Sequence, residues 1–334
     1  MKPLMSSEIY ITEPYGNRAP FPEPAWYNAL ASPHYEESHR RVHDHNIEDH
    51  ISPNILDWEE KGHVPDEARL HFARAGLIYP DLPEGYRWDV FHSLVVSYEL
   101  SRIWAAGVSA GMSGVSGETT IGVPLVIHHG GSDLANLRAT AIKSEDGGHH
   151  VVNEHKKWIT GALRATRMTT AVRTGGPGMG GISVLVTPLD LPRKCQQTTS
   201  SGKKTLDFNR ERFILAVFMN GQARICLEDA WAYAMDRQTF GKPPIAHRII
   251  RHKLVAMARY VESHWAWLEQ IAYHTRATGS MGTDLASRIA LAKVHGGRLL
   301  ELVSREAQQI FGGAGYQRGG VEMRVEQISR DSCG

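Results

Sequence analysis

A cation, a hydroxyl group and an aromatic ring stand close together in the segment RQTFGKP, residues 237–243. The apolar spacing before this segment predicts a helix that ends near Thr239, and the glycine and prolines that follow predict a turn. The planar guanidinium of Arg237 can donate two parallel hydrogen bonds, which suits a diphosphate. The pattern therefore indicates an anion site at a helix end, although a plain corner between two helices with a surface ion pair would have the same sequence.

A glycine cluster follows a long amphipathic pattern in the segment QIFGGAGYQR, residues 309–318. Gly312, Gly313 and Gly315 have no Cβ, so another backbone or a dinucleotide can approach them closely. The same glycines would also serve simply to end a helix. The pattern is not GxGxxG after a strand, so a Rossmann-type site is not indicated.

Neither a metal site nor a disulfide framework is predicted. His43, His45 and His50 lie in a charged stretch with helical spacing, but no HExxH-type pattern accompanies them. We interpret them as part of a solvated helix face. The three cysteines lie far apart and form no CxxC pair, so we expect free thiols in a reducing, intracellular compartment.

The composition is that of a globular protein with a sizeable core. The chain has 334 residues, 42% of them hydrophobic and 22% charged, and its formal net charge is +1. This balance favours neither nucleic acid nor an anionic membrane as a partner. No apolar run approaches the ~20 residues that span a bilayer, and residues 1–11 lack the features of a secretory signal. We expect an intracellular protein, with peroxisome, mitochondrion and cytoplasm left open.

The composition and the hydrophobic periodicity of the sequence change along the chain and predict four parts. Residues 1–32 contain several prolines and aromatics and are interpreted as an irregular arm. Residues 33–120 have mostly helical periodicity, and residues 121–205 are predicted to form a small, mostly antiparallel β domain. Residues 206–334 carry long apolar stripes at helical spacing with short connections, which indicates a bundle of antiparallel helices.

Several individual elements follow from the same patterns. Helices are predicted over residues 65–75 and 88–111. Strands are predicted around residues 151–152, 168–173 and 182–186, with glycine-rich turns at 147–148 and 175–181. Residues 279–282 are predicted to separate the second long bundle helix from the third.

The two motifs together resemble the acyl-CoA dehydrogenase family. RQTFGKP, the run IIRHKLVAMA that follows it and QIFGGAGYQRG occur in the order of that family and at about its usual separation. Upstream, GSDLA at 131–135 is similar to the family's GSD loop. KKWITG at 156–161 is similar to its KKWITNG flavin motif, without the Asn. The resemblance runs from about Trp26 onward and is with fungal members in particular.

The resemblance implies an α+β fold with an N-terminal α domain, a middle β domain and a C-terminal four-helix bundle. It also implies FAD as cofactor, bound non-covalently between β domain and bundle, an acyl-CoA substrate, and a homodimer or homotetramer. Residues expected to contact the flavin ring are Trp158, Ile159 and Thr160. Residues expected to hold the FAD diphosphate and adenosine are Arg237, Thr239 and Phe240. Arg248 is also expected near the FAD, at a position where the family often has Gln. Residues expected to cover a neighbouring FAD are Gln309, Ile310, Phe311, Gly312 and Gly313. Residues expected at the acyl-CoA site are Ser132, Asn209 and Arg212.

In this family a carboxylate removes the α-proton of the acyl thioester while the β-hydrogen leaves as hydride. Many members carry the carboxylate after the GGxGY stretch, in a segment that would follow Gly334. Others place it at the start of the first bundle helix, where this chain has Glu211. Glu211 is therefore the predicted catalytic base, although an acidic residue in a first helical turn is also favoured by the helix dipole. Glu322 and Glu326 are interpreted as surface residues.

Two departures from the family bear on activity. Residues that usually precede the GSD loop are missing between Ile127 and Gly131, and the last β-domain strands are missing between Lys204 and Phe208. Lost strands leave backbone groups unpaired, so cofactor binding could be weak. The leading hypothesis is an acyl-CoA dehydrogenase of fatty-acid oxidation or of secondary-metabolite (for example toxin) biosynthesis. The alternatives are a catalytically impaired remnant that acts as a binding or oligomer partner, and a flavin oxidase resembling nitroalkane oxidase. The electron acceptor is left open.

Overall fold

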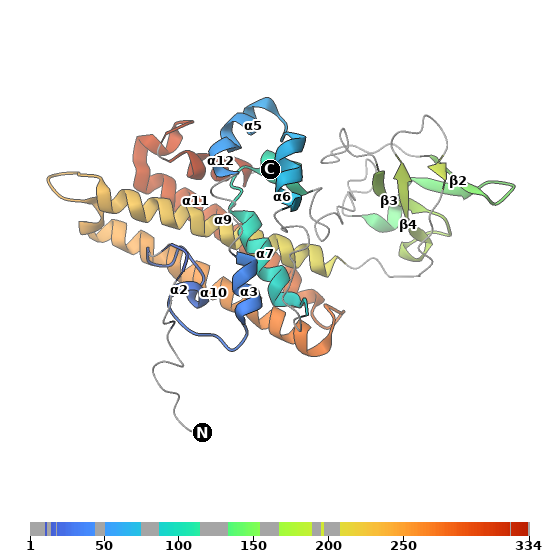
Figure 1. Cartoon of the computed structure of the whole chain (residues 1–334), viewed down its shortest axis with the longest axis horizontal. Helices are drawn as coiled ribbons and strands as arrows, with labels where there is room; N and C mark the ends of the chain where they lie inside the picture. Colours follow the sequence, from blue (N-terminus) through green and yellow to red (C-terminus); the bar gives the residue numbers. More distant parts are fainter. Residues whose placement is uncertain are drawn as a thin grey trace, which may run out of the picture. The chain divides into compact units, whose positions relative to one another are not determined.

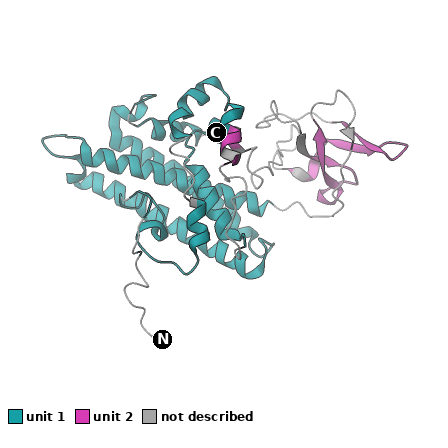
Figure 2. Cartoon of the chain, viewed as in Figure 1, with its two compact units in different colours: residues 1–68, 80–109, 208–334 teal, residues 69–79, 110–207 magenta. Residues whose placement is uncertain are grey.

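The computed structural model describes residues 11, 15–17, 19–43, 51–74, 87–113, 133–153, 167–188, 195–196, 208–320 and 322–332. The chain divides into two compact units, shown in Figure 2. The helical unit consists of residues 1–68, 80–109 and 208–334. The sheet unit consists of residues 69–79 and 110–207. The α+β class is confirmed, while the predicted boundaries at residues 32, 120 and 205 stay predictions.

Three long helices form the centre of the helical unit (Figure 1). They are α9 (Asn209–Asp236), α10 (Arg248–Thr278) and α11 (Ala286–Phe311). Each buries an apolar stripe, and α9 packs against both of the others. The predicted break between the second and third helices is confirmed, because Gly279 ends α10 with a φ of 74° that other residues rarely adopt. The shorter α12 (Met323–Asp331) packs against α9 and α11.

The N-terminal residues add smaller helices to this unit. They are α2 (Ala25–Asn28), α3 (Glu37–His43), α5 (Ile55–Lys61) and α7 (Val90–Ser101), with a 3-10 turn at Ser52–Asn54. The helix predicted over 65–75 is confirmed as α6 (Asp66–Arg74), of which residues 66–68 belong to the helical unit and residues 69–74 to the sheet unit. The predicted arm is more ordered than expected, because Trp26 and Tyr27 of α2 are buried and Trp26 stacks on Tyr35 with ring centroids 3.8 Å apart.

The single helix predicted over 88–111 is wrong in one respect, because the structure has two helices there. After α7, residues 102–105 are not helical, and α8 (Ala106–Ser113) begins a new helix. Its first N–H groups are taken by carboxylates from distant segments. Ala106 N donates to Asp331 Oδ2 at 2.9 Å, and Val108 N donates to Glu59 Oε2 at 3.2 Å. These acceptors stabilise a second helix start.

One position shows how closely α7 and α9 cross. A Cβ built on Gly221 of α9 would lie 1.8 Å from Ser101 Oγ of α7. No other residue type fits there without moving a helix. Gly221 therefore joins an early segment of the chain to the bundle that follows much later.

A chain of buried polar groups crosses the bundle. His264 Nε2 donates to the Ala292 carbonyl at 3.0 Å, and its Nδ1 lies 3.2 Å from Asn220 Nδ2. Asn220 Oδ1 accepts from Arg224 Nε at 3.1 Å. Arg224 Nη1 in turn donates to Glu262 at 2.7 Å and to the carbonyls of Phe21 and Glu23 at 3.0 and 2.9 Å. The chain links α11, α10 and α9 to the arm.

The sheet unit contains a five-stranded sheet with the order β4-β3-β1-β2-β5. Its strands are β1 (Thr140–Lys143), β2 (His149–Asn153), β3 (Arg167–Arg173), β4 (Ile182–Pro188) and β5 (Cys195–Gln196). Only the β1–β3 pairing is parallel among these strands, which confirms the mostly antiparallel prediction. Ala141, Val172 and Leu185 form the core of its buried face.

Arg173 fixes the glycine-rich turn predicted at 175–181. Its guanidinium donates to four backbone carbonyls, those of Ala135, Leu137, Gly176 and Gly178, at 2.6, 3.1, 2.6 and 3.0 Å. The turn packs so closely that a Cβ on Gly181 would lie 1.8 Å from the Gly176 oxygen. One side chain thus holds this turn to the segment around the 3-10 turn Leu134–Asn136.

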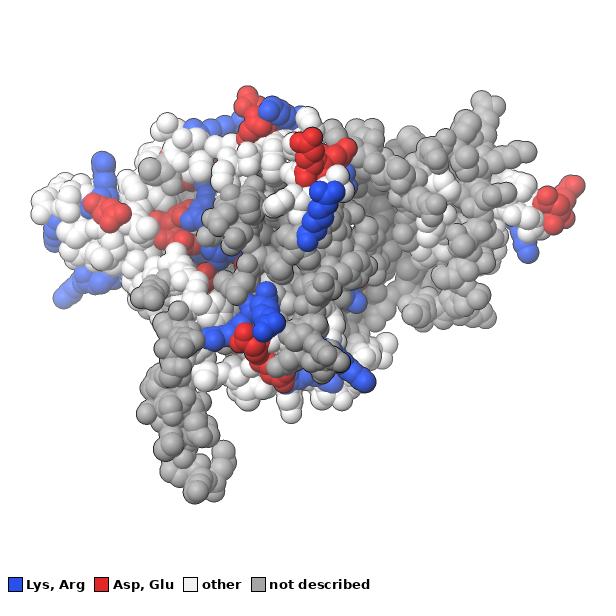
Figure 3. All heavy atoms as spheres, in the orientation of Figure 1, with Lys and Arg blue, Asp and Glu red and all other residues white. Residues whose placement is uncertain are grey.

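The described surface mixes both signs of charge. On the face drawn in Figure 3, Lys and Arg are interspersed with Asp and Glu and do not gather into one basic area. Among the described helices, none combines the length and apolar character needed to cross a membrane.

Candidate functional site

The predicted site residues of the helical unit fall at the two ends of α9. Asn209, Glu211 and Arg212 belong to its first turn, and Arg237 follows its last residue. With a rise of 1.5 Å per residue, these ends are ~40 Å apart. Within one protomer, Glu211, the predicted base, and Arg237, the predicted contact to a diphosphate, therefore lie at opposite ends of α9. We call the end with Glu211 the base end and the end with Arg237 the anion end.

At the base end, a carboxylate oxygen lies buried without a partner. Glu211 is half-buried, and its Oε2 is shielded from solvent with no hydrogen bond from any described residue. Buried polar atoms are usually hydrogen-bonded, so this oxygen needs an explanation, as does Glu322 Oε2, which is also buried without a partner among the described residues. The Glu211 oxygen is able to accept a proton. The Arg212 side chain beside it is exposed.

Asn209 is fixed in the same turn. It is 2% exposed, and its Nδ2 donates to the carbonyls of Met281 and Gly282 at 3.0 and 3.2 Å. Those carbonyls lie in the connection between α10 and α11, so one amide ties the start of α9 to both neighbouring helices.

At the anion end, the chain turns sharply after α9. The helix ends at Asp236, slightly before the predicted Thr239. Thr239 and Lys242 exchange two backbone hydrogen bonds of 2.9 and 3.1 Å around the tip of the turn. Phe240 at the tip has a φ of 52° and is 96% exposed. A left-handed conformation disfavours a non-glycine residue by roughly 1–2 kcal/mol, so strain accompanies the outward placement of this ring.

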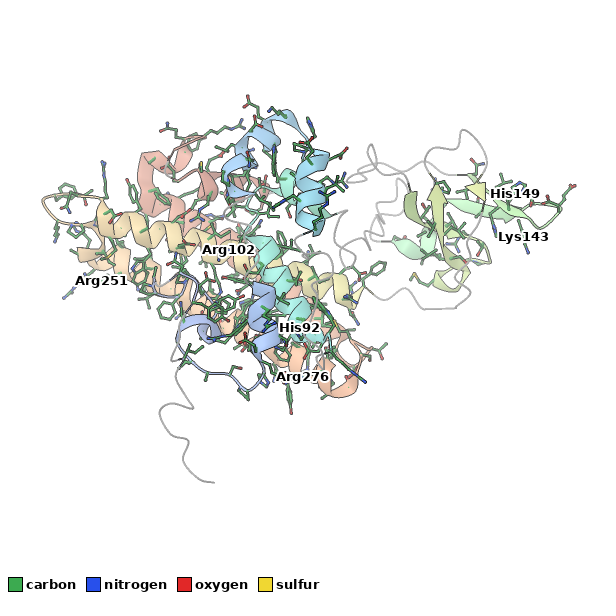
Figure 4. All side chains as sticks on the ribbon, in the orientation of Figure 1. His92, Arg102, Lys143, His149, Arg251 and Arg276 are labelled. Atoms are coloured by element: carbon green, nitrogen blue, oxygen red, sulfur yellow. The ribbon has the colours of Figure 1, made fainter. Side chains whose placement is uncertain are left out.

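Cationic side chains surround that turn. Arg237 and Arg248 are both exposed, and neither forms an ion pair with any described residue. Arg251, labelled in Figure 4, donates from Nη1 to the Ile245 carbonyl at 2.9 Å and so braces the 3-10 turn Pro244–Ala246. His247, directly before α10, has a buried Nε2 with no hydrogen-bond partner among the described residues.

The end of α11 lies beside the end of α9. The rings of Tyr233 and Phe311 are 4.6 Å apart, and the Tyr233 hydroxyl donates to the Phe311 carbonyl at 3.5 Å. Ile310 is buried like Phe311, whereas Gln309, Gly312 and Gly313 are exposed. Gly312 ends α11 with a φ of 65°, and a Cβ there would meet open space. The structure thus brings these residues to the anion end.

Four predicted site residues, Ser132, Trp158, Ile159 and Thr160, lie outside the described residues. The predicted flavin-ring contacts therefore stay predictions. The stretches predicted to be missing, between Ile127 and Gly131 and between Lys204 and Phe208, also lie outside them, except for Phe208 itself.

Two glutamates near the C-terminal end of the helical unit were predicted at the surface, and one of these predictions is wrong. Glu322 is 1% exposed, because the α12 helix that it precedes buries Val325 and Ile328 against the bundle. Glu326 is half-buried and pairs with Arg330 at 3.0 Å.

The sequence patterns did not reveal a cluster of His39, Asp89 and His92, of which His92 is labelled in Figure 4. Asp89 Oδ1 lies 3.2 Å from His39 Nε2 and 2.7 Å from His92 Nδ1. Burial alone would raise the pKa of Asp89, but hydrogen bonds from the two histidines hold this pKa well below its usual range.

This cluster has nitrogen and oxygen atoms that could bind a metal ion, but these atoms already form hydrogen bonds. Asp89 Oδ1 accepts from the N–H groups of Phe91 and His92 at the start of α7. The other ring nitrogens face Glu36 N at 2.9 Å and Ser38 Oγ at 3.1 Å. We interpret it as a helix cap that joins α3 to α7. The Asp-x-x-His spacing before an apolar helix is the signal that could have found its α7 half.

Three sequence models of one family match the chain in order. They describe the N-terminal domain of acyl-CoA dehydrogenase at residues 35–136, its middle domain at 128–213 and its C-terminal domain at 204–333. The chain is 30% identical to the acyl-CoA dehydrogenase apdG of Emericella nidulans, covering 94% of this chain and 90% of that one. It is 32% identical to an acyl-CoA dehydrogenase of Alternaria alternata, covering 95% and 91%.

Solved structures agree in fold. A probable acyl-CoA dehydrogenase from Mycobacterium abscessus has a TM-score of 0.73 and 27% identity, over 90% of this chain and 94% of that one. A glutaryl-CoA dehydrogenase from Mycobacterium smegmatis in complex with FADH2 has a TM-score of 0.72 and 19% identity, over 89% and 90%. The alignment with the Emericella protein runs over 403 positions, more than the 334 residues of this chain, so that relative has stretches with no counterpart here.

Proposed function

The chain belongs to the acyl-CoA dehydrogenase family, and from this we propose that it is an FAD-dependent oxidoreductase that dehydrogenates the Cα–Cβ bond of an acyl-CoA thioester. The observation that carries the proposal beyond family membership is the buried, unpartnered Oε2 of Glu211. In the proposed reaction this oxygen takes the α-proton of the thioester.

The placement of Glu211 suits a base. It lies in the first turn of α9, a position where an acidic side chain interacts favourably with the helix dipole. Partial burial keeps water away from the oxygen that must accept the proton. The neighbouring Asn209 is committed to backbone carbonyls, so it does not compete for this oxygen.

The residues at the anion end fit the outer part of FAD. Arg237 is exposed and forms no ion pair with any described residue, so its guanidinium is available for a diphosphate. Phe240 offers a fully accessible ring face, and the glycines after α11 leave open space. We propose that Thr239 and Arg248 assist Arg237, while Trp158, Ile159 and Thr160 contact the flavin ring. When bound, FAD accepts the β-hydrogen as hydride.

The separation of the two ends supports an oligomer. Because ~40 Å of helix lies between Glu211 and Arg237, one α9 would serve two different FAD molecules. We propose a homodimer or homotetramer, in which the segment Gln309 to Gly313 covers the FAD of a neighbouring copy.

Anaerobic titration of the purified protein with acyl-CoAs of different chain length and branching tests this function. We expect a flavin absorbance spectrum that bleaches on addition of at least one acyl-CoA, and the preferred chain would separate fatty-acid oxidation from secondary-metabolite biosynthesis. A flavin spectrum that no acyl-CoA changes would contradict the proposal.

A second candidate is a catalytically impaired remnant that acts as a binding or oligomer partner. The positions of the Emericella relative that have no counterpart in this chain favour it, because such gaps can remove cofactor contacts. A colourless, folded oligomer that gains no flavin on incubation with FAD would support this candidate and exclude the enzyme.

A further inference from the structure

We propose that Asn209 is a positioning residue for Glu211, which it serves by locking the first turn of α9 to the connection between α10 and α11. This inference rests on the proposed function, in which Glu211 accepts the α-proton. It gives Asn209 a role different from the substrate contact that the sequence predicts.

The contacts of Asn209 are those of an internal anchor. Its side chain is 2% exposed, and Nδ2 uses both hydrogens on the carbonyls of Met281 and Gly282, at 3.0 and 3.2 Å. Those carbonyls follow Gly279, which ends α10, and precede α11. A substrate could reach the two N–H groups of this amide only by displacing both hydrogen bonds.

The first turn of α9 depends on this anchor. The first four N–H groups of a helix have no partner within the helix, so helix starts open readily. Phe208, the residue before α9, provides no side-chain cap. The next firm contact is Phe213, which is 1% exposed and lies one turn further on. Asn209 is therefore a polar group that joins the turn carrying Glu211 to the connection between α10 and α11.

Glu211 needs such support more than most carboxylates do. Its buried Oε2 has no hydrogen bond from a described residue that would hold it in place. The position of this oxygen is thus set by the backbone beneath it. A base must come within ~2.6–3.2 Å of the proton that it removes, and a misplacement of ~1 Å can slow a reaction by about 100-fold.

The test compares Asn209→Ala and Asn209→Ser with wild type in anaerobic rapid-mixing experiments. The readouts are the rate constant of flavin reduction per bound flavin at saturating acyl-CoA, and the Kd for acyl-CoA. We expect Asn209→Ala to lower the rate constant by about 10- to 100-fold while Kd changes by less than about threefold. Asn209→Ser keeps one donor and should recover part of the rate. Thr283→Ala, a change at an exposed side chain of the connection between α10 and α11, is the matched control.

A double-mutant cycle with Glu211→Gln asks whether Asn209 acts through Glu211. If it does, Asn209→Ala should slow wild type but should not further slow the residual reaction of the Glu211→Gln protein. Equal losses in both backgrounds would overturn the inference. So would a raised Kd with an unchanged rate constant, which would identify a substrate contact. A lower yield of folded flavoprotein with an unchanged rate constant per flavin would show a purely structural role.

Failure of the proposed function is a separate outcome. If Glu211→Gln reduces its flavin as fast as wild type does, the assignment of the base is wrong whatever Asn209 does. Amide hydrogen exchange of residues 209–213 in the Asn209→Ala protein, measured without acyl-CoA, tests the anchor alone. Unchanged exchange there would also overturn the inference.

Discussion

The base end and the anion end of α9 are built in opposite ways. At the base end, the Asn209 amide is buried on two carbonyls and the Glu211 oxygen is withdrawn from water. At the anion end, Phe240 is 96% exposed in a left-handed conformation, and the Arg237 and Arg248 side chains are exposed. The first end withdraws a carboxylate oxygen from water, and the second exposes two guanidinium groups and an aromatic ring.

This difference distinguishes two requirements of a flavoenzyme. Proton transfer needs a fixed group in a water-poor place, because distance and solvation control its rate. Cofactor binding needs accessible donors and ring faces, because the ligand itself buries them. Substitutions at the base end should therefore change the rate of flavin reduction, and substitutions at the anion end should change the affinity for FAD.

The largest effect is expected at the base end. Glu211→Gln removes the proton acceptor and should slow flavin reduction by about 100- to 10,000-fold. FAD affinity should stay close to that of wild type, because Glu211 is ~40 Å from Arg237. Stopped-flow absorbance and fluorescence titration measure the two quantities, with Glu60→Gln, at an exposed carboxylate of α5, as control. A Glu211→Gln protein that reduces its flavin at the wild-type rate would contradict the assignment of proton transfer to the base end.

Between its two ends, α9 is joined to α10 and α11 by the buried hydrogen bonds of Arg224, Asn220 and His264. Burial lowers the pKa of His264 from 6.5 to about 4. Between pH 6.5 and pH 4, the unfolded chain binds a proton at His264 that the folded chain does not bind. The free energy of unfolding therefore has its full value above pH 6.5 and decreases as the pH falls toward 4. The loss from this group is about 3 kcal/mol.

Urea unfolding of wild type and His264→Gln at pH 7, 5.5 and 4 would measure that loss. The variant should show a weaker dependence on pH, while His252→Gln, at an exposed position of α10, should behave like wild type. Equal pH dependence in all three proteins would mean that the burial of His264 does not contribute to the pH dependence of stability.

At the anion end, Arg237→Ala should raise the Kd for FAD by about 10- to 100-fold, the typical loss for a charge-assisted hydrogen bond. The rate of reduction at saturating FAD should be unchanged, which is the reverse of the Glu211→Gln result. Isothermal titration of apoprotein gives the Kd. Arg298→Ala, which removes an 81% exposed side chain, is the control. An Arg237→Ala protein with wild-type affinity would show that the diphosphate binds elsewhere.

The smallest effect concerns strain in the turn. Phe240→Gly relieves the left-handed conformation and should stabilise the FAD-free protein by about 0.5–1 kcal/mol. The same change removes a ring face and should weaken FAD binding by about threefold to tenfold. Thermal unfolding without FAD and titration with FAD would show these opposite signs. A variant that is less stable and binds FAD equally well would refute a binding role for the ring.

Patterns of neighbouring residues predicted those strands and helix ends that depend on local backbone preferences. The strands around residues 168–173 and 182–186, the end of α10 at Gly279 and the end of α11 at Gly312 follow from alternation or from glycine. At the site, the sequence predicted the turn after α9 but not the exposure of Phe240, and it proposed Glu211 but not its buried oxygen.

Long-range contacts decided the features that the sequence did not reveal. The break between α7 and α8 depends on Glu59 and Asp331, whose carboxylates cap a helix far away in sequence. The His39–Asp89 contact joins positions 50 residues apart. The burial of Glu322 depends on how α12 packs. No window of neighbouring residues contains this information.

The tight crossing at Gly221 has a consequence for how the protein is made. Its partner Ser101 leaves the ribosome long before α9 does, because residues 110–207 of the sheet unit are translated in between. At 5–20 residues per second that interval is roughly 5–20 s. During it, the apolar face of α7 has no bundle to pack against. We therefore expect the nascent N-terminal helices to be the segment that chaperones hold and that proteases cut first.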